Sequence, residues 1–300
     1  MRVTESQLQS LALRTLSDNR VRLLDAQKTA MTGRRIDTPS DDPTASARAR
    51  LLGALQTESE GYLSNVEYGE LRLRQAEIAL SEGSSVLVRV KELALAMANE
   101  TMSAQQRAGT AIEVDELRRS LIDLAGTKQG DEFVFANVDS TSALVDPAGN
   151  FTYDVDTFFD VRDVEIGSSA RGEISASGAH AFAQRAVDPN SVDVFKVLED
   201  LSTALTANDP TGVRAQIDNI DQAHNQVVAE RSKTGIRLNR LSLAHESAVQ
   251  AKDLYVLLES DLVDADAAEA FTKLSLADTA LQAAIAVASR LQGSTLLNVL

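Results

Sequence analysis

The feature that most constrains the fold of this chain is a heptad repeat that is sustained from Leu55 to Met97. Apolar residues occupy ten of its thirteen positions, and the alternating spacing of three and four residues puts every position on one side of an α-helix. Such a helix is about 60 Å long at 1.5 Å per residue. Because so long an apolar stripe must be covered, the repeat predicts a second long helix beside it. The thirteen positions are Leu55, Ser59, Tyr62, Val66, Gly69, Leu73, Ala76, Leu80, Gly83, Leu87, Val90, Ala94 and Met97.

A second repeat, more often interrupted by polar residues, runs from Val213 to Leu262. The five prolines, at positions 39, 43, 147, 189 and 210, lie outside both repeats. Ser103 and Gln106 have the spacing of a capping box and predict a further helix, and the patterns over 4–32 and beyond Glu269 predict a helix near each terminus. The predicted fold class is therefore mainly α: a long antiparallel coiled-coil-like helical bundle formed by both chain ends.

The stretch from Met31 to Arg50 predicts one sharp turn between the first helix and the long second helix. Gly33 suits a left-handed helix end, and Asp42 before Pro43 suits an N-cap followed by proline at the first helical position. The acidic residues of this stretch also allow a catalytic or metal-binding interpretation. Capping is favoured, because no histidine or third carboxylate lies nearby to complete a site.

The hydrophobic period changes between Asp131 and about Phe182, where aromatic and β-branched residues alternate in short runs separated by turn signals. This predicts a small β-rich outer domain inserted into the bundle. The expected organisation is residues 1–130 and 186–300 as the two halves of a discontinuous helical core, with the β-rich subdomain over 131–185. Residues 131–166 hold nine acidic residues and one arginine, which favours a solvated surface over a cation site and excludes binding to phosphate backbones.

Several classes of chemistry find no support in the sequence. The chain has no cysteine, which excludes disulfides, thiol nucleophiles and zinc-thiolate sites. Its three histidines, at positions 180, 224 and 245, are scattered, and neither a phosphate loop nor a G-x-S-x-G or H-E-x-x-H motif is present. We therefore expect no enzyme, no cofactor and no metal. No apolar run is long enough for membrane insertion, and the first residues lack the apolar core of a cleaved signal peptide.

Several segments resemble the bacterial flagellin family, and they occur in the family's order. MTGRRIDTPSDDPTASARAR, from Met31, is similar to the segment that links the first terminal helix to the long core helix. The run from Val90 to Asn137 resembles the exit of the long helix, the next helix and the entry to the outer domain. RSKTGIRLNRLS from Arg231, LVDADAAEAFTKLS from Leu262 and the final LLNVL agree with the C-terminal half.

The prolines at 39 and 43 resemble the family members that form the hook-filament junction more than those that form the filament. The resemblance implies a structural adaptor that is exported without a cleaved signal peptide and assembles as a ring of identical subunits outside the cell. It also implies contact with a neighbouring hook-associated junction protein, with flagellin and with an export chaperone. The assembly interface expected from it comprises Leu13, Leu16, Leu23, Arg34, Ile36, Pro39, Asp41, Asp42, Phe271, Leu274, Leu281, Ile285, Leu291, Leu296, Leu297 and Leu300.

Two alternatives stay open besides an enzyme. A flagellin, the filament subunit, differs from a junction protein in location and copy number rather than in chemistry. The paired prolines and the lack of a glutamine- and asparagine-rich ending to the last helix argue against it. A secreted coiled-coil scaffold unrelated to flagella is the second alternative.

Overall fold

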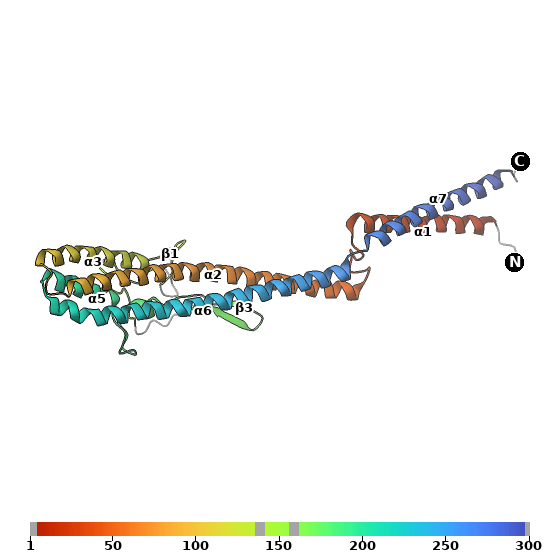
Figure 1. Cartoon of the computed structure of the whole chain (residues 1–300). Helices are drawn as coiled ribbons and strands as arrows, with labels where there is room; N and C mark the ends of the chain where they lie inside the picture. The colour runs from red at the N-terminus through yellow and green to blue at the C-terminus, as the bar shows by residue number, and fades with distance from the viewer. Residues whose placement is uncertain (1–4, 136–141, 156–161, 298–300) are drawn as a thin grey trace. The chain divides into compact units, whose positions relative to one another are not determined.

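The computed structural model describes residues 5–135, 142–155 and 162–297, and most of these residues are helical (Figure 1). The predicted mainly helical fold with a small β portion is confirmed. The helices are α1 (Glu5–Thr32), α2 (Pro43–Met97), α3 (Ala104–Ala125), α4 (Gly178–Phe182), α5 (Val194–Thr206), α6 (Pro210–Val263) and α7 (Ala267–Leu297). The strands are β1 (Lys128–Gln129), β2 (Glu132–Phe133), β3 (Asp163–Gly167) and β4 (Ala170–Glu173).

The chain forms two compact units. One, called the terminal unit here, holds residues 1–58 and 251–300, and therefore α1, α7 and the adjoining ends of α2 and α6. The other, the central unit, holds residues 59–250. Both long helices run from one unit into the other, so each unit contains a segment from both halves of the sequence.

The long helices α2 and α6 lie antiparallel in the central unit (Figure 1). Glu77 accepts a bond of 2.8 Å from Arg231, while Lys91, further along α2, pairs at 2.6 Å with Asp221, which comes earlier in α6. Every position of both predicted heptad repeats is buried or half-buried. The repeats therefore identified the contact faces of α2 and α6 correctly.

The core of the central unit also takes in the middle of the sequence. The rings of Phe135 and Phe182 meet edge to face with centroids 5.6 Å apart, and Phe182 lies 5.7 Å from Phe195 of α5. All three side chains are fully buried in the same cluster as the α2, α3 and α6 residues. The described residues of the middle segment thus pack directly on the helices, while the predicted boundaries at 131 and 185 stay a prediction.

The strands form two antiparallel pairs, β1 with β2 and β3 with β4. Ile166 of β3 packs against Val66, Leu73 and Leu241 of the long helices, which supplies the support that an isolated hairpin lacks. The predicted alternation is wrong at its end, because residues 178–182 form the short helix α4. Ser177 explains this start, since its hydroxyl accepts a bond of 3.2 Å from the amide of His180. Phe158 and Val161, also predicted in strands, lie outside the described residues.

A buried arginine joins the β1–β2 hairpin to α2. Arg72 is 1% exposed, and its side chain donates to the carbonyls of Phe133 and Val134 at 2.8 and 3.1 Å. It also pairs at 3.2 Å with Glu132, which accepts a further bond of 2.6 Å from Arg162. Burial lowers the pKa of Arg72 from its usual value, whereas the bond from Arg162 holds the pKa of Glu132 below its usual range. The hairpin is thus fixed to α2 by charged hydrogen bonds.

Candidate assembly interface

The turn after α1 is built as the sequence predicts. Gly33 has a φ of 69°, a left-handed conformation that glycine adopts without strain, and its amide donates to the carbonyl of Thr29 at 2.9 Å. The chain then pairs with the segment between α6 and α7. Arg35 donates from its amide to Val263 at 2.7 Å, and Ala265 donates to Gly33 at 2.8 Å. Backbone bonds therefore tie the exit of α1 to the entry of α7.

The two predicted acidic residues of the turn have different tasks. Asp42 caps α2, because its carboxylate accepts from the amides of Thr44 and Ala45 at 3.1 and 3.0 Å and Pro43 is the first helical residue. Asp41 instead caps the turn itself by accepting from the amides of Asp37 and Thr38 at 3.1 and 2.8 Å. The Thr38 and Asp37 amides hold the pKa of Asp41 below its usual range. The capping interpretation of this cluster is confirmed.

The remaining predicted residues of the turn divide into buried and exposed. Ile36 is 5% exposed, and its amide donates to Val263 at 3.3 Å, so it anchors the turn within the terminal unit. Arg34 and Pro39 are exposed. Arg35 lies 3.9 Å from Asp42 and donates to the carbonyl of Leu262 at 2.6 Å, so its partners are in the same chain.

The terminal helices α1 and α7 contact each other along a heptad face. On α7 the half-buried or buried positions recur with spacings of four and three residues from Ala270 to Ala288. Of the predicted interface leucines, Leu16 and Leu23 on α1 and Leu274 on α7 are half-buried, and so is Leu281. These four side chains lie on the half-covered faces of the α1–α7 pair.

Three other predicted interface residues point away from this contact. Leu13 is 59% exposed, Phe271 61% and Ile285 51%. Removing a large apolar side chain from water is favourable, so these three side chains favour contact with another apolar surface. Leu291, Leu296 and Leu297 lie in α7, but their side chains fall outside the described ones, and Leu300 lies outside the described residues altogether.

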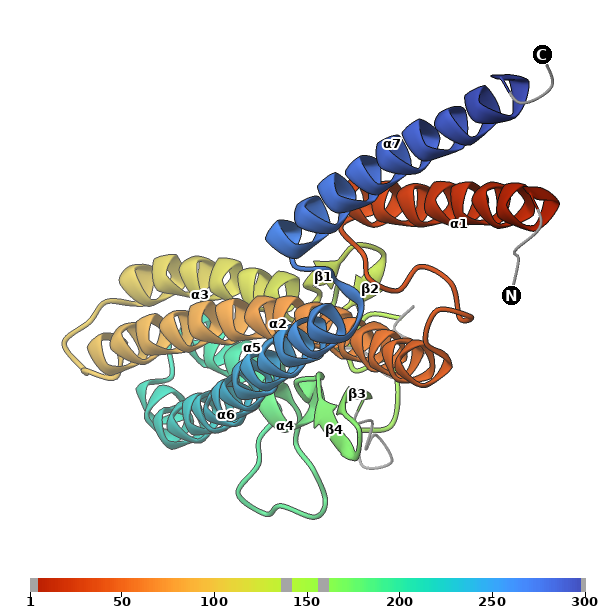
Figure 2. The same cartoon turned by 90° about the vertical axis from the view of Figure 1, so that its right-hand side faces the viewer.

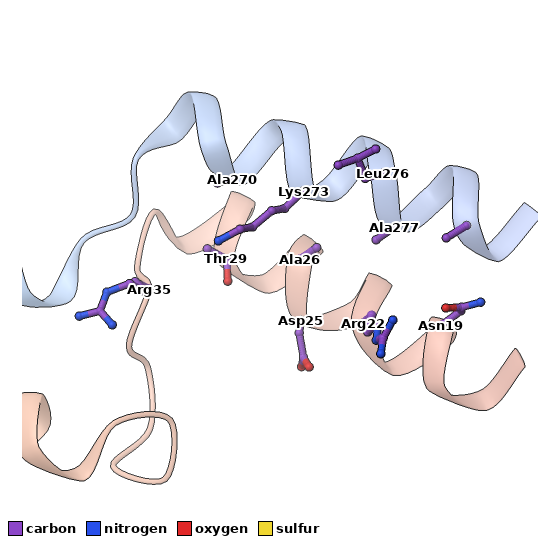
Figure 3. A pocket seen from close by; sticks show the side chains of 11 residues that line it. Asn19, Arg22, Asp25, Ala26, Thr29, Arg35, Ala270, Lys273, Leu276 and Ala277 are labelled. Atoms are coloured by element: carbon purple, nitrogen blue, oxygen red, sulfur yellow. The ribbon is translucent and has the colours of Figure 1, made fainter. Parts of the chain in front are cut away.

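A groove runs along the α1–α7 pair (Figure 3). One stretch has a volume of about 550 Å³ and is lined by small residues such as Ala26, Thr29 and Ala277, with Arg22, Asp25 and Lys273 at its rim. A second stretch of about 500 Å³ is more apolar. The two share Asn19 and Ala280, so they are continuous. The lining of the second stretch is completed by Leu11, Ala12, Thr15, Ala283, Ala284 and Val287.

Burial is scarce in the terminal unit. Among its described residues only four apolar side chains are buried, namely Ile36, Ala45, Val263 and Ala270. The central unit contains all the other buried apolar residues of the described chain. Large apolar side chains are exposed on all four helical segments of the terminal unit: Leu11, Leu13, Val21, Leu24, Met31, Leu51, Leu254, Val256, Leu257, Leu258, Phe271, Leu276, Ile285 and Val287.

Part of this exposed apolar surface was not predicted from the sequence. The sequence assigned no role to Leu51 on α2 or to Leu254, Val256, Leu257 and Leu258 on α6, all of which are exposed. The alanines of the groove could have been recognised from the sequence, because Ala270, Ala277 and Ala284 recur every seven residues. Small residues at heptad spacing allow close approach of another helix.

The described part of the chain contains neither a group that could hold a metal ion nor a helix that could span a membrane. Over residues 5–135, 142–155 and 162–297, no group of three or more histidine or carboxylate side chains is arranged to hold a metal ion. None of the helices described is both long and apolar enough to cross a bilayer.

Comparison with known proteins gives one consistent result. The bacterial flagellin N-terminal helical region matches residues 3–139, and the bacterial flagellin C-terminal helical region matches residues 217–300. The chain is 24% identical to flagellar hook-associated protein 3 of Escherichia coli strain K12, over 99% of this chain and 98% of that protein. It is 26% identical to a flagellin of Bacillus subtilis strain 168, over 97% of each. Its fold is similar to the flagellar junction protein FlgL from Legionella pneumophila, with a TM-score of 0.57 and 16% identity over 74% of this chain and 100% of that one.

Proposed function

Since this chain belongs to the bacterial flagellin family, we propose that it is a structural subunit of the flagellum and forms the adaptor between hook and filament. Support comes from its end-to-end similarity to hook-associated protein 3 of E. coli and from the junction protein with the same fold. Its paired prolines, at 39 and 43, favour the junction members of the family over the filament members.

The observation that carries the proposal is the contrast between the two units. The central unit has an extensive core, whereas the described terminal unit buries four apolar residues and exposes fourteen large ones. Fully burying such a side chain contributes about 1.5–3 kcal/mol. A unit that leaves so much of this free energy unused gains it by packing against other subunits.

Assembly follows from this arrangement. The groove between α1 and α7 and the exposed side chains around it receive the terminal helices of neighbouring subunits, so that copies of the chain form a ring. Neighbours on the hook side and flagellin on the filament side contact the same helices at the two edges of that ring. Before assembly, an export chaperone shields these helices, and the chain leaves the cell without cleavage of a signal peptide. It acts as a structural part and not as an enzyme.

The filament subunit remains the alternative function, because the B. subtilis flagellin is similar over nearly the whole chain. Both functions use the same terminal helices and predict the same effects of mutations there. They differ in copy number, since a filament is an open helical assembly of many subunits and a junction is a closed ring.

Deletion of the gene in its source bacterium separates the possibilities. If the chain is the junction adaptor, electron microscopy shows hooks without filaments, and immunoblots show flagellin in the medium. Re-expression of the chain restores the filaments. Cells that keep their filaments would refute a flagellar role, and hooks without any flagellin in cells or medium would identify the chain as the filament subunit.

A further inference from the structure

Met31 is the most exposed large apolar side chain of the described residues, at 86%. It lies in the last turn of α1, where hydrogen bonds fix the end of the helix. Gly33 donates from its amide to the carbonyl of Thr29 at 2.9 Å. The hydroxyl of Thr32 donates to the carbonyl of Lys28, also at 2.9 Å. The exposure of Met31 is therefore a property of a well-defined helix end and not of a frayed one.

The Met31 side chain continues an apolar stripe along α1. Leu13, Leu24 and Met31 are spaced by eleven and seven residues, which are close to whole turns of the helix. Leu13 is 59% exposed and Leu24 56%. The partner helix α7 packs along a different side of α1, where Leu16 and Leu23 are half-buried (Figures 1 and 2). Within the terminal unit, the stripe is thus left uncovered.

Methionine is the residue type of this chain that oxidants attack most readily. The sequence contains four methionines and neither cysteine nor tryptophan. Oxidants convert the methionine thioether to a sulfoxide, and an exposed sulfur is the easiest to reach. Met97 is half-buried against the core of the central unit, and Met102 is also half-buried. Met1 lies outside the described residues. Among the described methionines, an oxidant therefore reaches Met31 first.

We propose that Met31 is a site of reversible oxidation by peroxides and that its sulfoxide prevents the subunit from assembling. This inference rests on the proposed function, in which neighbouring subunits cover the exposed side of α1. The sulfur attacks one oxygen of hydrogen peroxide, the O–O bond breaks, and the second oxygen leaves as water. The sulfur loses two electrons and the peroxide gains them. A sulfoxide reductase that uses a dithiol reverses the change and forms a disulfide and water.

The sulfoxide weakens the contact because it is polar. An apolar methionine side chain gains free energy when a neighbour removes it from water, whereas a sulfoxide then loses its hydrogen bonds to water. The expected loss of affinity is roughly tenfold. Once the subunit has assembled, its neighbours cover the same sulfur. Oxidation therefore stops subunits before they assemble and spares those that are already in place.

Peptide mapping of the isolated full chain tests the selectivity. The chain is treated with increasing concentrations of hydrogen peroxide and digested with trypsin, and mass spectrometry gives the sulfoxide fraction at each methionine. Met31 falls in the tryptic peptide of residues 29–34, apart from the other methionines. It is expected to oxidise several times faster than Met97 and Met102. Oxidation of either of these two at the same rate as Met31 would overturn the assignment of the site.

Competition for assembly tests the consequence. Met31→Gln imitates the polar sulfoxide without an oxidant, and Met31→Leu is the matched control because it keeps an apolar side chain and has no sulfur. Each variant is produced together with the wild type, and mass spectrometry of isolated flagella gives the ratio of the two chains. Met31→Gln is expected to fall to roughly a tenth of the wild-type share, whereas Met31→Leu keeps its share. After the cells are exposed to peroxide, newly assembled flagella are expected to be enriched in Met31→Leu.

The outcomes separate this inference from the proposed function. If neither the wild type nor Met31→Leu enters flagella, the proposed function is wrong, and the effect of Met31 on assembly is overturned with it. If both enter flagella and Met31→Gln enters equally well, the proposed function stands and the inference alone is overturned. An equal share of wild type and Met31→Leu after exposure to peroxide, with sulfoxide detected in peptide 29–34, would also overturn it.

Discussion

Replacement of Phe271 by alanine separates the stability of the isolated chain from its ability to assemble. Phe271 lies at the start of α7 and is 61% exposed, so more than half of its side chain contributes nothing to the isolated subunit. Scaling the 1.5–3 kcal/mol for burial of a whole phenylalanine by this fraction gives about 1–2 kcal/mol that a neighbour gains by covering it. This corresponds to a roughly five- to thirtyfold weaker contact in the Phe271→Ala variant.

The isolated Phe271→Ala chain is expected to melt almost as the wild type does. Its main transition reports the core of the central unit, to which Phe271 does not belong. Leu80→Ala provides the opposite case, because Leu80 is fully buried in that core and its truncation lowers the free energy of unfolding by about 2–5 kcal/mol.

The assay measures incorporation by competition. Wild-type and variant chains are produced together in cells that lack the chromosomal copy, and mass spectrometry of isolated flagella gives the ratio of the two. Val187→Ala, which removes an equally exposed apolar side chain from the central unit, is the control and keeps its share. Equal incorporation of Phe271→Ala, or a loss of monomer stability as large as that of Leu80→Ala, would refute the reasoning.

Four further perturbations have expected outcomes. Asp42→Ala removes the cap of α2 and destabilises the first turns of this helix by about 1 kcal/mol, which is measured as faster amide exchange there, and Asp42→Asn retains most of this stability. Arg72→Met deprives the buried carbonyls of Phe133 and Val134 of their donor and lowers the free energy of unfolding by roughly 2–3 kcal/mol; a neutral effect would remove the assigned role of Arg72. The pKa of Glu132 is lower in the folded state than in the unfolded state, so its ionised carboxylate stabilises the fold above the unfolded pKa. This stabilisation is lost as the pH falls through the folded pKa. The difference in melting temperature between wild type and Glu132→Gln therefore shrinks below about pH 4. Deletion of Leu291 to Leu300 abolishes incorporation and leaves the melting of the central unit unchanged, as followed by circular dichroism and by immunoblots of isolated flagella.

The elements that follow from local chemistry could be predicted from the sequence. The heptad positions of α2 and α6 are buried or half-buried as expected, since a repeat of that length has one way to cover its apolar side. The caps at Asp42 and Ser103 are likewise local, because each depends on side chains within three residues. The left-handed helix end at Gly33 was predicted from the local sequence in the same way.

The features that depend on contacts between distant segments were beyond the sequence. Arg107 is buried and donates to the carbonyls of Met97 and Asn99 and to Asn208, which lies a hundred residues away. No periodic pattern in the sequence indicates such a role, and a charged residue in a helix is normally expected to be exposed to water. The β-rich segment was predicted to extend to about Phe182, whereas residues 178–182 form the short helix α4, because so short an apolar pattern suits either structure.

The candidate interface could be predicted only in part, because it too depends on contacts between distant segments. The sequence locates the apolar positions of α1 and α7 but does not reveal which of them the two helices cover for each other. Leu16 and Leu274 prove half-buried, whereas Leu13 and Phe271 remain exposed. That distinction depends on the rotation of one helix against the other, which only the three-dimensional arrangement supplies.

Hydrogen exchange measured by mass spectrometry, on the isolated chain and on flagella that contain it, tests the central claim most directly. Regions with few buried apolar contacts open easily, so in the isolated chain the amides of α1 and α7 exchange fast while those of the central unit stay protected. On assembly the account predicts strong protection of α1 and α7, with little change in the core of the central unit. Equal protection of α1 and α7 in both states would contradict the claim that the terminal unit gains its stability from neighbouring subunits.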